Sequence, residues 1–188
     1  MKNFCINYLS NESKEYLKDS LWEIFKGQIP IVACIGTDAI VGDSLGPLTG
    51  SMIKQKLYGK TFVFGTMENT ITAKDVDIVS EFLQNAYPGV PVLAIDAALG
   101  KKAEIGNLKI FQDSLKPGLG VDKKLKELGD VSLIAVVEQK EGGKALLSSV
   151  RLSLVYNIAT IISDAFCKYV EESLEQRELN QCSFVANF

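Results

Sequence analysis

Hydrophobic residues form five short runs along the chain. Four of the runs are continuous, at residues 31–36, 61–65, 91–96 and 131–137, and a fifth alternates with polar residues at 107–112. Continuous apolar runs bounded by Pro and Gly are typical of strands buried on both faces, as in a parallel sheet. The pattern therefore predicts five strands, most of them central to a sheet.

Stretches with apolar residues at helical spacing lie between these runs. They cover residues 10–27, 45–57, a segment that begins near Val76 and stops at Pro88, and residues 147–169. The last is apolar almost all round and is expected to be deeply packed. Strands that alternate with helices in this way predict a doubly wound α/β fold with right-handed crossovers.

The expected architecture is a single α/β/α domain over residues 1–188, a three-layer sandwich around a mostly parallel five-stranded sheet. If the 31–36 strand lies between the strands at 61–65 and 91–96, the point where the winding reverses lies between 31–36 and 91–96. About ten residues separate 91–96 from 107–112, which is too few for a parallel crossover. The 107–112 strand is therefore predicted to be antiparallel and at the edge. Residues 172–188 form a mixed tail.

Composition narrows the chemistry. The 188-residue chain has no histidine, which excludes a Ser–His–Asp hydrolase, a Cys–His protease and any metal site with an imidazole ligand. Its four cysteines lie far apart, so neither a zinc knuckle nor a thioredoxin-type site is expected. A formal net charge of -3 gives no basic field for nucleic acid or anionic membrane. With no signal peptide or apolar span, a cytoplasmic protein is expected.

Two aspartates fall where an open α/β sheet binds its ligands, outside the carboxyl ends of the strands. Asp43 lies between the first strand and its helix, and Asp96 closes the third strand. Asp43 could instead cap the helix that follows it. Asp96 is harder to explain structurally, because an unpaired carboxylate at the end of a buried strand is costly.

Other residues are expected to surround this pair and bind substrate. Thr66 and Glu68 follow the second strand, Gly42 precedes Asp43, and Lys116 and Gly118 could form another wall. Each has a plainer role as a turn or surface residue. Cys34, inside the first strand and without a neighbouring base, is expected to be an inert core thiol.

Three motifs carry a resemblance to a known family. Gly42-Asp-Ser-Leu-Gly-Pro47, Ala94-Ile-Asp-Ala-Ala98 and Lys116-Pro-Gly-Leu-Gly-Val121 resemble the sporulation protein YyaC family. That family is related to the spore germination protease and, more distantly, to the hydrogenase maturation proteases. The resemblance implies a phosphorylase/hydrolase-like sandwich. It also implies that Asp43 and Asp96 match two aspartates proposed as catalytic in the germination protease, and two acidic metal contacts of the maturation enzymes.

The chain departs from these relatives in several ways. The maturation enzymes also hold nickel with a histidine, which is absent here. The germination protease commonly carries histidine before its Pro-Gly, where this chain has Lys116. The chain is also shorter than that protease and shows no obvious propeptide. The first departure argues against a hydrogenase role, and the others leave the substrate open.

The resulting hypothesis is a sporulation-associated endopeptidase that uses an aspartate dyad without a required cofactor. Its substrates would be proteins or peptides, small spore proteins among them, in the forespore or mother cell. One alternative is a non-catalytic sporulation factor that binds a peptide or partner in the same place. Another is a divalent metal held by Asp43, Asp96 and Glu68. Whether the chain is an enzyme, and whether it forms a homo-oligomer, stay open at this point.

Overall fold

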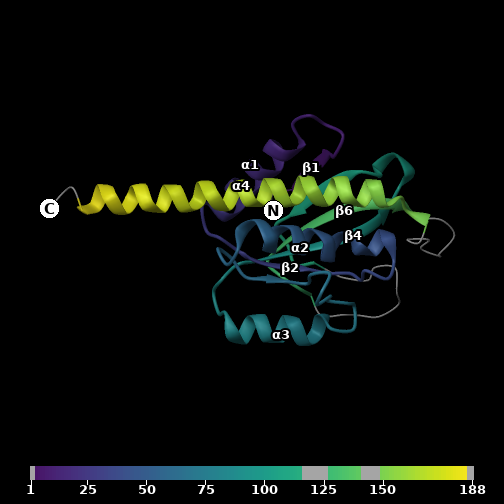
Figure 1. The fold of residues 1–188 in the computed structure, drawn as a ribbon, viewed down its shortest axis with the longest axis horizontal. Coiled ribbons are helices and arrows are strands. Elements are labelled where there is room, and N and C mark those ends of the chain that lie inside the picture. Colours follow the sequence, from purple (N-terminus) through teal and green to yellow (C-terminus); the bar gives the residue numbers. More distant parts are fainter. Residues whose placement is uncertain (1–2, 116–126, 141–148, 186–188) are drawn as a thin grey trace.

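The computed structural model describes residues 3–115, 127–140 and 149–185. Within them, a six-stranded sheet carries helices on both faces (Figure 1). The strands are β1 (Asn3–Asn7), β2 (Ile31–Cys34), β3 (Val63–Phe64), β4 (Val92–Gly100), β5 (Asn107–Phe111) and β6 (Val131–Gln139). The helices are α1 (Ser13–Phe25), α2 (Leu45–Leu57), α3 (Val76–Ala86) and α4 (Leu152–Val185), with short 3-10 turns η1 (Val41–Ser44) and η2 (Lys102–Glu104).

The centre of the sheet is parallel, as the apolar runs predict. The strand order is β1-β5-β6-β4-β2-β3, in which β2 pairs in parallel with β3 and β4, and β4 with β6. β2 thus lies between β3 and β4, which is the order that the expected switch point requires. Because parallel strands share a direction, the carboxyl ends of β2, β3 and β4 lie along one edge of the sheet.

One side of the sheet differs from the prediction. β5 is antiparallel to β6, as expected, but it does not form the edge, because β1 pairs with it from Asn3–Phe111 to Asn7–Asn107. The sheet thus has six strands where five were predicted. The signal for β1 is weak because only Phe4 and Ile6 pack, and both are only partly buried.

The C-terminal segment also differs from the prediction. α4 continues to Val185, so the expected tail at 172–188 is helical as far as that residue. Residues 175–181 are exposed, and a helix without a buried stripe leaves no apolar pattern to predict it from. Figure 1 shows this end of α4 running beyond the other elements. In the described ranges, no helix combines the length and the apolar character that a membrane crossing requires.

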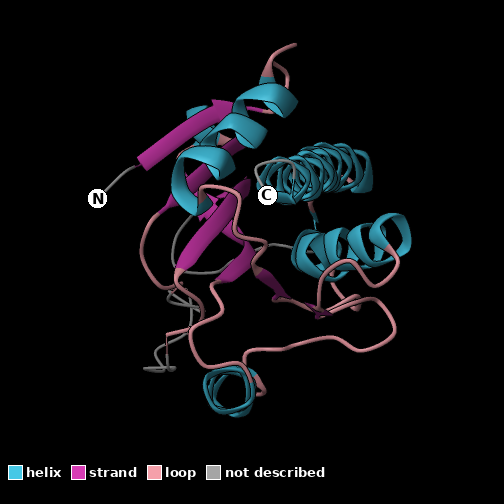
Figure 2. Cartoon of the chain, turned by 90° about the vertical axis from the view of Figure 1, so that its left-hand side faces the viewer, coloured by secondary structure: helices cyan, strands magenta, loops and turns pink. Residues whose placement is uncertain are grey.

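Two apolar cores lie on opposite faces of the sheet. Val32 and Cys34 of β2 point toward the core with α1, α2 and α4, while Ile31, Ala33 and Ile35 point toward the core with α3. This division follows from the alternation of side chains along a strand. Figure 2 shows α3 on one side of the strands and the other helices across from it. The three-layer α/β/α sandwich is confirmed.

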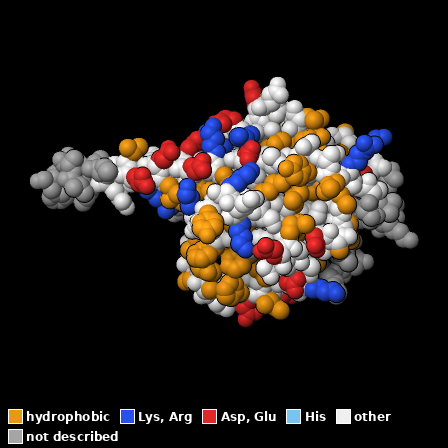
Figure 3. Space-filling view, in the orientation of Figure 1, with side chains coloured by type: hydrophobic (Ala, Val, Ile, Leu, Met, Phe, Trp, Pro, Cys, Tyr) orange, Lys and Arg blue, Asp and Glu red, His pale blue; other side chains and the backbone are white. Residues whose placement is uncertain are grey.

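The short strand β3 forms the other edge of the sheet and is covered by aromatic side chains. Phe62 stacks with Tyr87 at a ring-centroid distance of 5.0 Å, and Phe64 meets Phe82 edge to face at 5.9 Å. Figure 3 shows hydrophobic side chains gathered at the lower left, where α3 lies in Figure 1. Both a short edge strand and side chains packed across it limit pairing with other chains.

Candidate active site

Asp43 and Asp96 are brought together at the carboxyl edge of the sheet. Asp43 lies in η1, the short turn that leads into α2, and η1 contacts β4. Asp96 lies in β4, one residue beyond the last β2–β4 pair, Cys34–Ile95. The negative charge of Asp43 is also one of the causes that raise the pKa of Asp96, as expected for two carboxyls at the same edge of the sheet. The structure thus brings together the two residues that the sequence singles out.

The loop before α2 holds Asp43 through its own backbone. The Thr37 N–H donates to Asp43 Oδ2 at 3.1 Å and to the Asp43 C=O at 3.2 Å. Gly36 makes this closure feasible, because it has a φ of +137° and a Cβ there would lie 2.0 Å from the Asp43 carbonyl oxygen. The bonded amide precedes Asp43, so this contact is not the cap of the following helix that the sequence also allowed. The backbone of the loop thus holds the Asp43 carboxyl in a fixed position beside Thr37.

Burial raises the pKa of the Asp43 carboxyl above its ordinary range, and the Thr37 N–H opposes part of that rise. Protein atoms crowd a carboxyl and remove water that would stabilise its charge. Asp43 remains partly accessible to solvent. It can therefore meet a water molecule or a substrate.

The pKa of the Asp96 carboxyl is raised further than that of Asp43. Burial and then the charge of Asp43 raise the pKa of Asp96 to about 8, while its hydrogen bond from the Ala97 N–H, at 2.7 Å, acts in the opposite direction. The Asp96 residue as a whole is partly exposed, but its carboxyl is buried. Near neutral pH, the state in which the two carboxyls share one proton is therefore favoured over the state in which both are ionised.

Cys34 lies beside this pair but offers no nucleophile. Its thiol is buried, and both burial and the charge of Asp96 raise its pKa. Since the thiolate is the reactive form of cysteine, the structure supports the expectation of an inert core thiol.

Close backbone contacts fix α2 on the ends of the strands. A Cβ on Gly46 would lie 2.0 Å from the Ile35 carbonyl oxygen, and a Cβ on Gly50 would lie 2.1 Å from that of Gly65. Gly46 therefore lets the first turn of α2 approach the backbone of Ile35, which directly follows β2. Gly42 is buried within η1, and its part in binding substrate stays a prediction.

The residues after β3 lie in two different environments. Thr66 is 4% exposed, and within the described part of the chain its Oγ1 has no hydrogen-bond partner. The Glu68 side chain is 79% exposed and lies 3.7 Å from Lys54 Nζ on α2. Thr66 is thus a buried polar group at the carboxyl edge, whereas Glu68 faces solvent.

Glu68 does not join the two aspartates, as the alternative with a divalent metal would require. Across the ranges that the structure describes, no three Asp, Glu or Cys side chains lie close enough together to hold a metal ion. Glu68 is not available as a third ligand, because its side chain turns outward beside Lys54. Lys116 and Gly118, expected to form another wall, lie outside the described residues.

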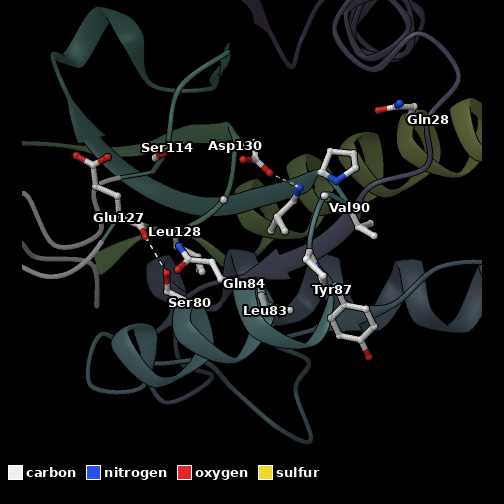
Figure 4. Close-up of a pocket in the computed structure, with 15 residues that line it drawn as sticks. Gln28, Ser80, Leu83, Gln84, Tyr87, Val90, Ser114, Glu127, Leu128 and Asp130 are labelled. Carbon is white, nitrogen blue, oxygen red and sulfur yellow. Dashed lines mark hydrogen bonds between the residues drawn. The ribbon is translucent and has the colours of Figure 1, made fainter.

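A separate cavity of about 670 Å³ lies at the amino ends of β4 and β6, away from the aspartate pair. Two hydrogen bonds cross its lining (Figure 4): the Ser80 hydroxyl donates to the Glu127 C=O at 3.1 Å, and the Val92 N–H donates to Asp130 Oδ2 at 2.8 Å. Sequence reasoning did not predict this cavity. Its walls come from one side of α3 and from loops at the amino edge, where no motif stands out.

Comparisons with known proteins confirm the YyaC resemblance. The chain matches the family described as "Protein of unknown function (DUF1256)" over residues 5–165. It is 33% identical over 155 residues to "Uncharacterized protein YyaC" of Bacillus subtilis (strain 168), covering 82% of this chain and 76% of that protein.

Among solved structures, the chain is similar to the NiFe hydrogenase maturation protease HycI from Thermococcus kodakarensis KOD1. The TM-score is 0.48 at 18% identity, covering 78% of this chain and 98% of that one. The family match, together with the relative at 33% identity, shows that the chain belongs to the DUF1256 family.

Proposed function

We propose that the protein is a peptidase that hydrolyses a peptide bond with Asp43 and Asp96. The observation that carries the proposal is the coupled pair itself. Asp43 and Asp96 lie at the same edge of the sheet, and burial together with the charge on Asp43 raises the pKa of Asp96 to about 8. Titratable groups that shift one another in this way are concentrated at functional sites.

The two aspartates take different roles in the proposed reaction. Asp96, protonated near neutral pH, donates a hydrogen bond to the scissile carbonyl oxygen. The pKa of Asp43 is raised less than that of Asp96, and its carboxylate accepts a hydrogen bond from the Thr37 N–H. Asp43 is therefore the ionised member of the pair. Its carboxylate takes a proton from water as the water oxygen bonds to the carbonyl carbon, and the proton of Asp96 passes to the carbonyl oxygen.

Collapse of the resulting tetrahedral intermediate completes the reaction. The C–N bond breaks, Asp43 gives its proton to the leaving nitrogen, and the hydroxyl proton of the intermediate returns to Asp96. The products are a carboxylic acid and an amine, and the dyad is restored. The chemistry needs no histidine, in keeping with a chain that contains none.

The side chains present do not fit a nickel site of the maturation-protease kind. Two carboxylates without a histidine or a nearby third ligand, as found among the described residues, make a sparse donor set. No step of the mechanism is therefore routed through a metal.

The proposed setting is the cytoplasm of a sporulating cell, forespore or mother cell, and the proposed substrates are proteins or peptides, including small spore proteins. The motif resemblance supports this setting, and the curated relative comes from Bacillus subtilis. If a protein or peptide binds at the same two aspartates and is not cleaved, the proposed function becomes binding instead of catalysis.

A peptide library prepared from sporulating cells tests the proposal. Wild-type protein and the variant Asp38→Asn are expected to generate new peptide termini, detected by mass spectrometry. Asp43→Asn and Asp96→Asn are expected to lower cleavage at least ~100-fold, the usual scale for removing a general acid or base. Asp38 is exposed in the same loop as Asp43, so its variant matches the change in charge.

Thermal unfolding of each variant shows whether the fold is retained. The proposal is wrong if folded Asp43→Asn or Asp96→Asn cleaves at the wild-type rate, or if wild-type protein cleaves nothing in the library.

A further inference from the structure

β4 extends beyond the strand that pairs with it. The β2–β4 register ends at Cys34–Ile95, and the Ile35 N–H still donates to the Ile95 C=O at 2.8 Å. The chain then leaves this row, because the next main-chain donor that would face β4, the Thr37 N–H, donates to Asp43 instead. Among the described residues, β4 from Asp96 to Gly100 is therefore paired with β6 alone.

The alternation of a strand shows which main-chain groups face the side that β2 leaves open. Ile95 faces β2, so Ala97 and Leu99 face the same way. Gly100 faces β6, because its C=O accepts the Lys140 N–H at 2.9 Å. The one-residue irregularity in the β4–β6 register leaves β4 itself continuous through residues 98–100.

Asp96 shares this open side. Its Oδ1 accepts the Ala97 N–H, one of the groups directed away from β6. The Ala97 C=O and the Leu99 N–H have no hydrogen-bond partner in the part of the chain that the structure describes. An unpaired acceptor and an unpaired donor on alternate residues are what a strand offers to a further strand.

We propose that the open edge of β4 binds the substrate as an added strand, with main-chain hydrogen bonds to the Ala97 C=O and the Leu99 N–H. The inference rests on the proposed peptidase function and identifies its substrate class as an extended, unfolded polypeptide segment. Such a strand continues the row of β2, about 4.8 Å from β4. Its main chain then passes the carboxyl of Asp96.

The side chains along this edge suit the proposal. Ala97 and Ala98 follow Asp96, and Gly100 ends the strand, so Leu99 is the one large side chain at this end of β4. Recognition through main-chain groups selects for an extended backbone more than for particular side chains. Folded proteins and segments with proline at the donating position are expected to bind poorly, because proline has no N–H.

Amide hydrogen exchange followed by NMR tests the edge directly. The probe is reduced, carboxymethylated α-lactalbumin, a permanently unfolded protein, and native α-lactalbumin is its folded control. The protein carries Asp43→Asn so that binding is observed without cleavage. The Leu99 amide is expected to exchange rapidly in the free protein and at least ~10-fold more slowly with the unfolded probe.

The Ala98 amide faces β6 and serves as the internal control, slow in both states. The inference is overturned if Leu99 is as slow as Ala98 in the free protein, if its exchange is unchanged by the unfolded probe, or if native α-lactalbumin protects it equally. Since this test reads binding alone, it separates failure of the strand site from failure of the proposed hydrolysis.

Two variants separate the contribution of the Leu99 main-chain N–H to substrate binding from that of the Leu99 side chain. Leu99→Pro removes the N–H, and Leu99→Ala keeps it while removing most of the side chain. KM for a peptide that the wild type cleaves is expected to be at least ~5-fold higher in Leu99→Pro than in Leu99→Ala, with similar kcat, as loss of one hydrogen bond predicts. Equal KM values in the two folded variants would contradict the inference.

Discussion

At the scale of single residues, the protonation of Asp96 links stability to pH. Its pKa is 3.8 in an unstructured chain and about 8 in the folded protein. Between these values the folded state binds more protons than the unfolded state, so the free energy of unfolding falls as pH rises and levels off above about pH 8. The proposed catalytic arrangement is thus a source of instability in neutral solution.

Asp96→Asn is expected to reduce this pH dependence. The wild type should lose up to ~1.4 kcal/mol for each pH unit between about pH 5 and pH 8 from this group, and the variant should lose less. Urea unfolding at pH 5, 6.5 and 8 measures the difference, with Asp38→Asn as the control. An unchanged slope in Asp96→Asn would show that the carboxyl is not protonated by folding.

Thr66 gives a second prediction for a single side chain. Its buried hydroxyl has no partner within the described ranges, so Thr66→Val is expected to raise the free energy of unfolding by ~1 kcal/mol. Thr49 is the matched control, because its buried hydroxyl donates to the Leu45 C=O at 2.7 Å and Thr49→Val should destabilise by ~1 kcal/mol. Chemical denaturation compares the two.

A loss of stability in Thr66→Val like that in Thr49→Val would show that the Thr66 hydroxyl is satisfied. Lower peptide cleavage together with higher stability would instead identify a group kept for substrate, as the sequence expectation has it.

The sequence predicts the aspartate pair but not its surroundings. Asp43 and Asp96 follow from the order of the apolar runs, because parallel strands bring their carboxyl ends to one edge. The direction of Glu68 does not follow, since it depends on how the loop after β3 turns and on the proximity of Lys54 on another element. Topology determines which residues share an edge, whereas local backbone geometry decides which of them face each other.

At the scale of elements, α2 and β3 approach β2 so closely that side chains are excluded. Gly65 has a φ of +81°, and a Cβ there would lie 1.8 Å from the Cys34 carbonyl oxygen. Gly65→Ala is therefore expected to lower the free energy of unfolding by more than ~3 kcal/mol, from strain and overpacking together.

Gly59→Ala is the matched control for Gly65→Ala. Gly59 has a φ of +85°, yet a Cβ there would meet nothing within 4 Å, so a loss of only ~1 kcal/mol is expected. Thermal and urea unfolding measure both variants. Equal losses would show that backbone conformation, and not the close approach to β2, makes glycine necessary at residue 65.

The elements that the sequence missed are those with little buried surface. β2, β4 and β6 are apolar on both faces and are evident from composition, whereas β1 has partly buried residues and pairs with β5 alone. The final turns of α4 are exposed and polar. Periodicity reports burial, so an element formed mainly by backbone hydrogen bonds leaves little pattern.

At the scale of the whole molecule, α4 connects distant parts of the chain. Its Glu172 accepts the Trp22 Nε1–H of α1 at 2.9 Å and lies 3.3 Å from Lys18 Nζ. Beyond Arg177, which donates to the Gly27 C=O, the helical residues up to 181 are exposed. We therefore expect α4 to stabilise the fold through its packed residues, up to Arg177, and not through the exposed residues beyond it.

Two truncations test this division of α4. A chain that ends at Arg177 is expected to unfold within ~1 kcal/mol of the full chain, because the residues removed up to 181 bury little. A chain that ends at Val170 also loses Glu172, the buried Ser173 and the partly buried Leu174, and should lose at least ~3 kcal/mol. Urea unfolding distinguishes them, and equal stabilities would contradict the division.

The parallel pairing of β2 with β4 has a consequence for the time at which the proposed acid–base pair forms. Asp43 is synthesised well before Asp96, and the two meet only after β4 has taken its place beside β2. A chain still emerging from the ribosome, or one that has lost its sheet, has two ordinary solvated carboxylates and no acid–base pair. Hydrolytic capacity would thus arise with the completed sheet, so incomplete chains would pose no danger to the unfolded proteins around them.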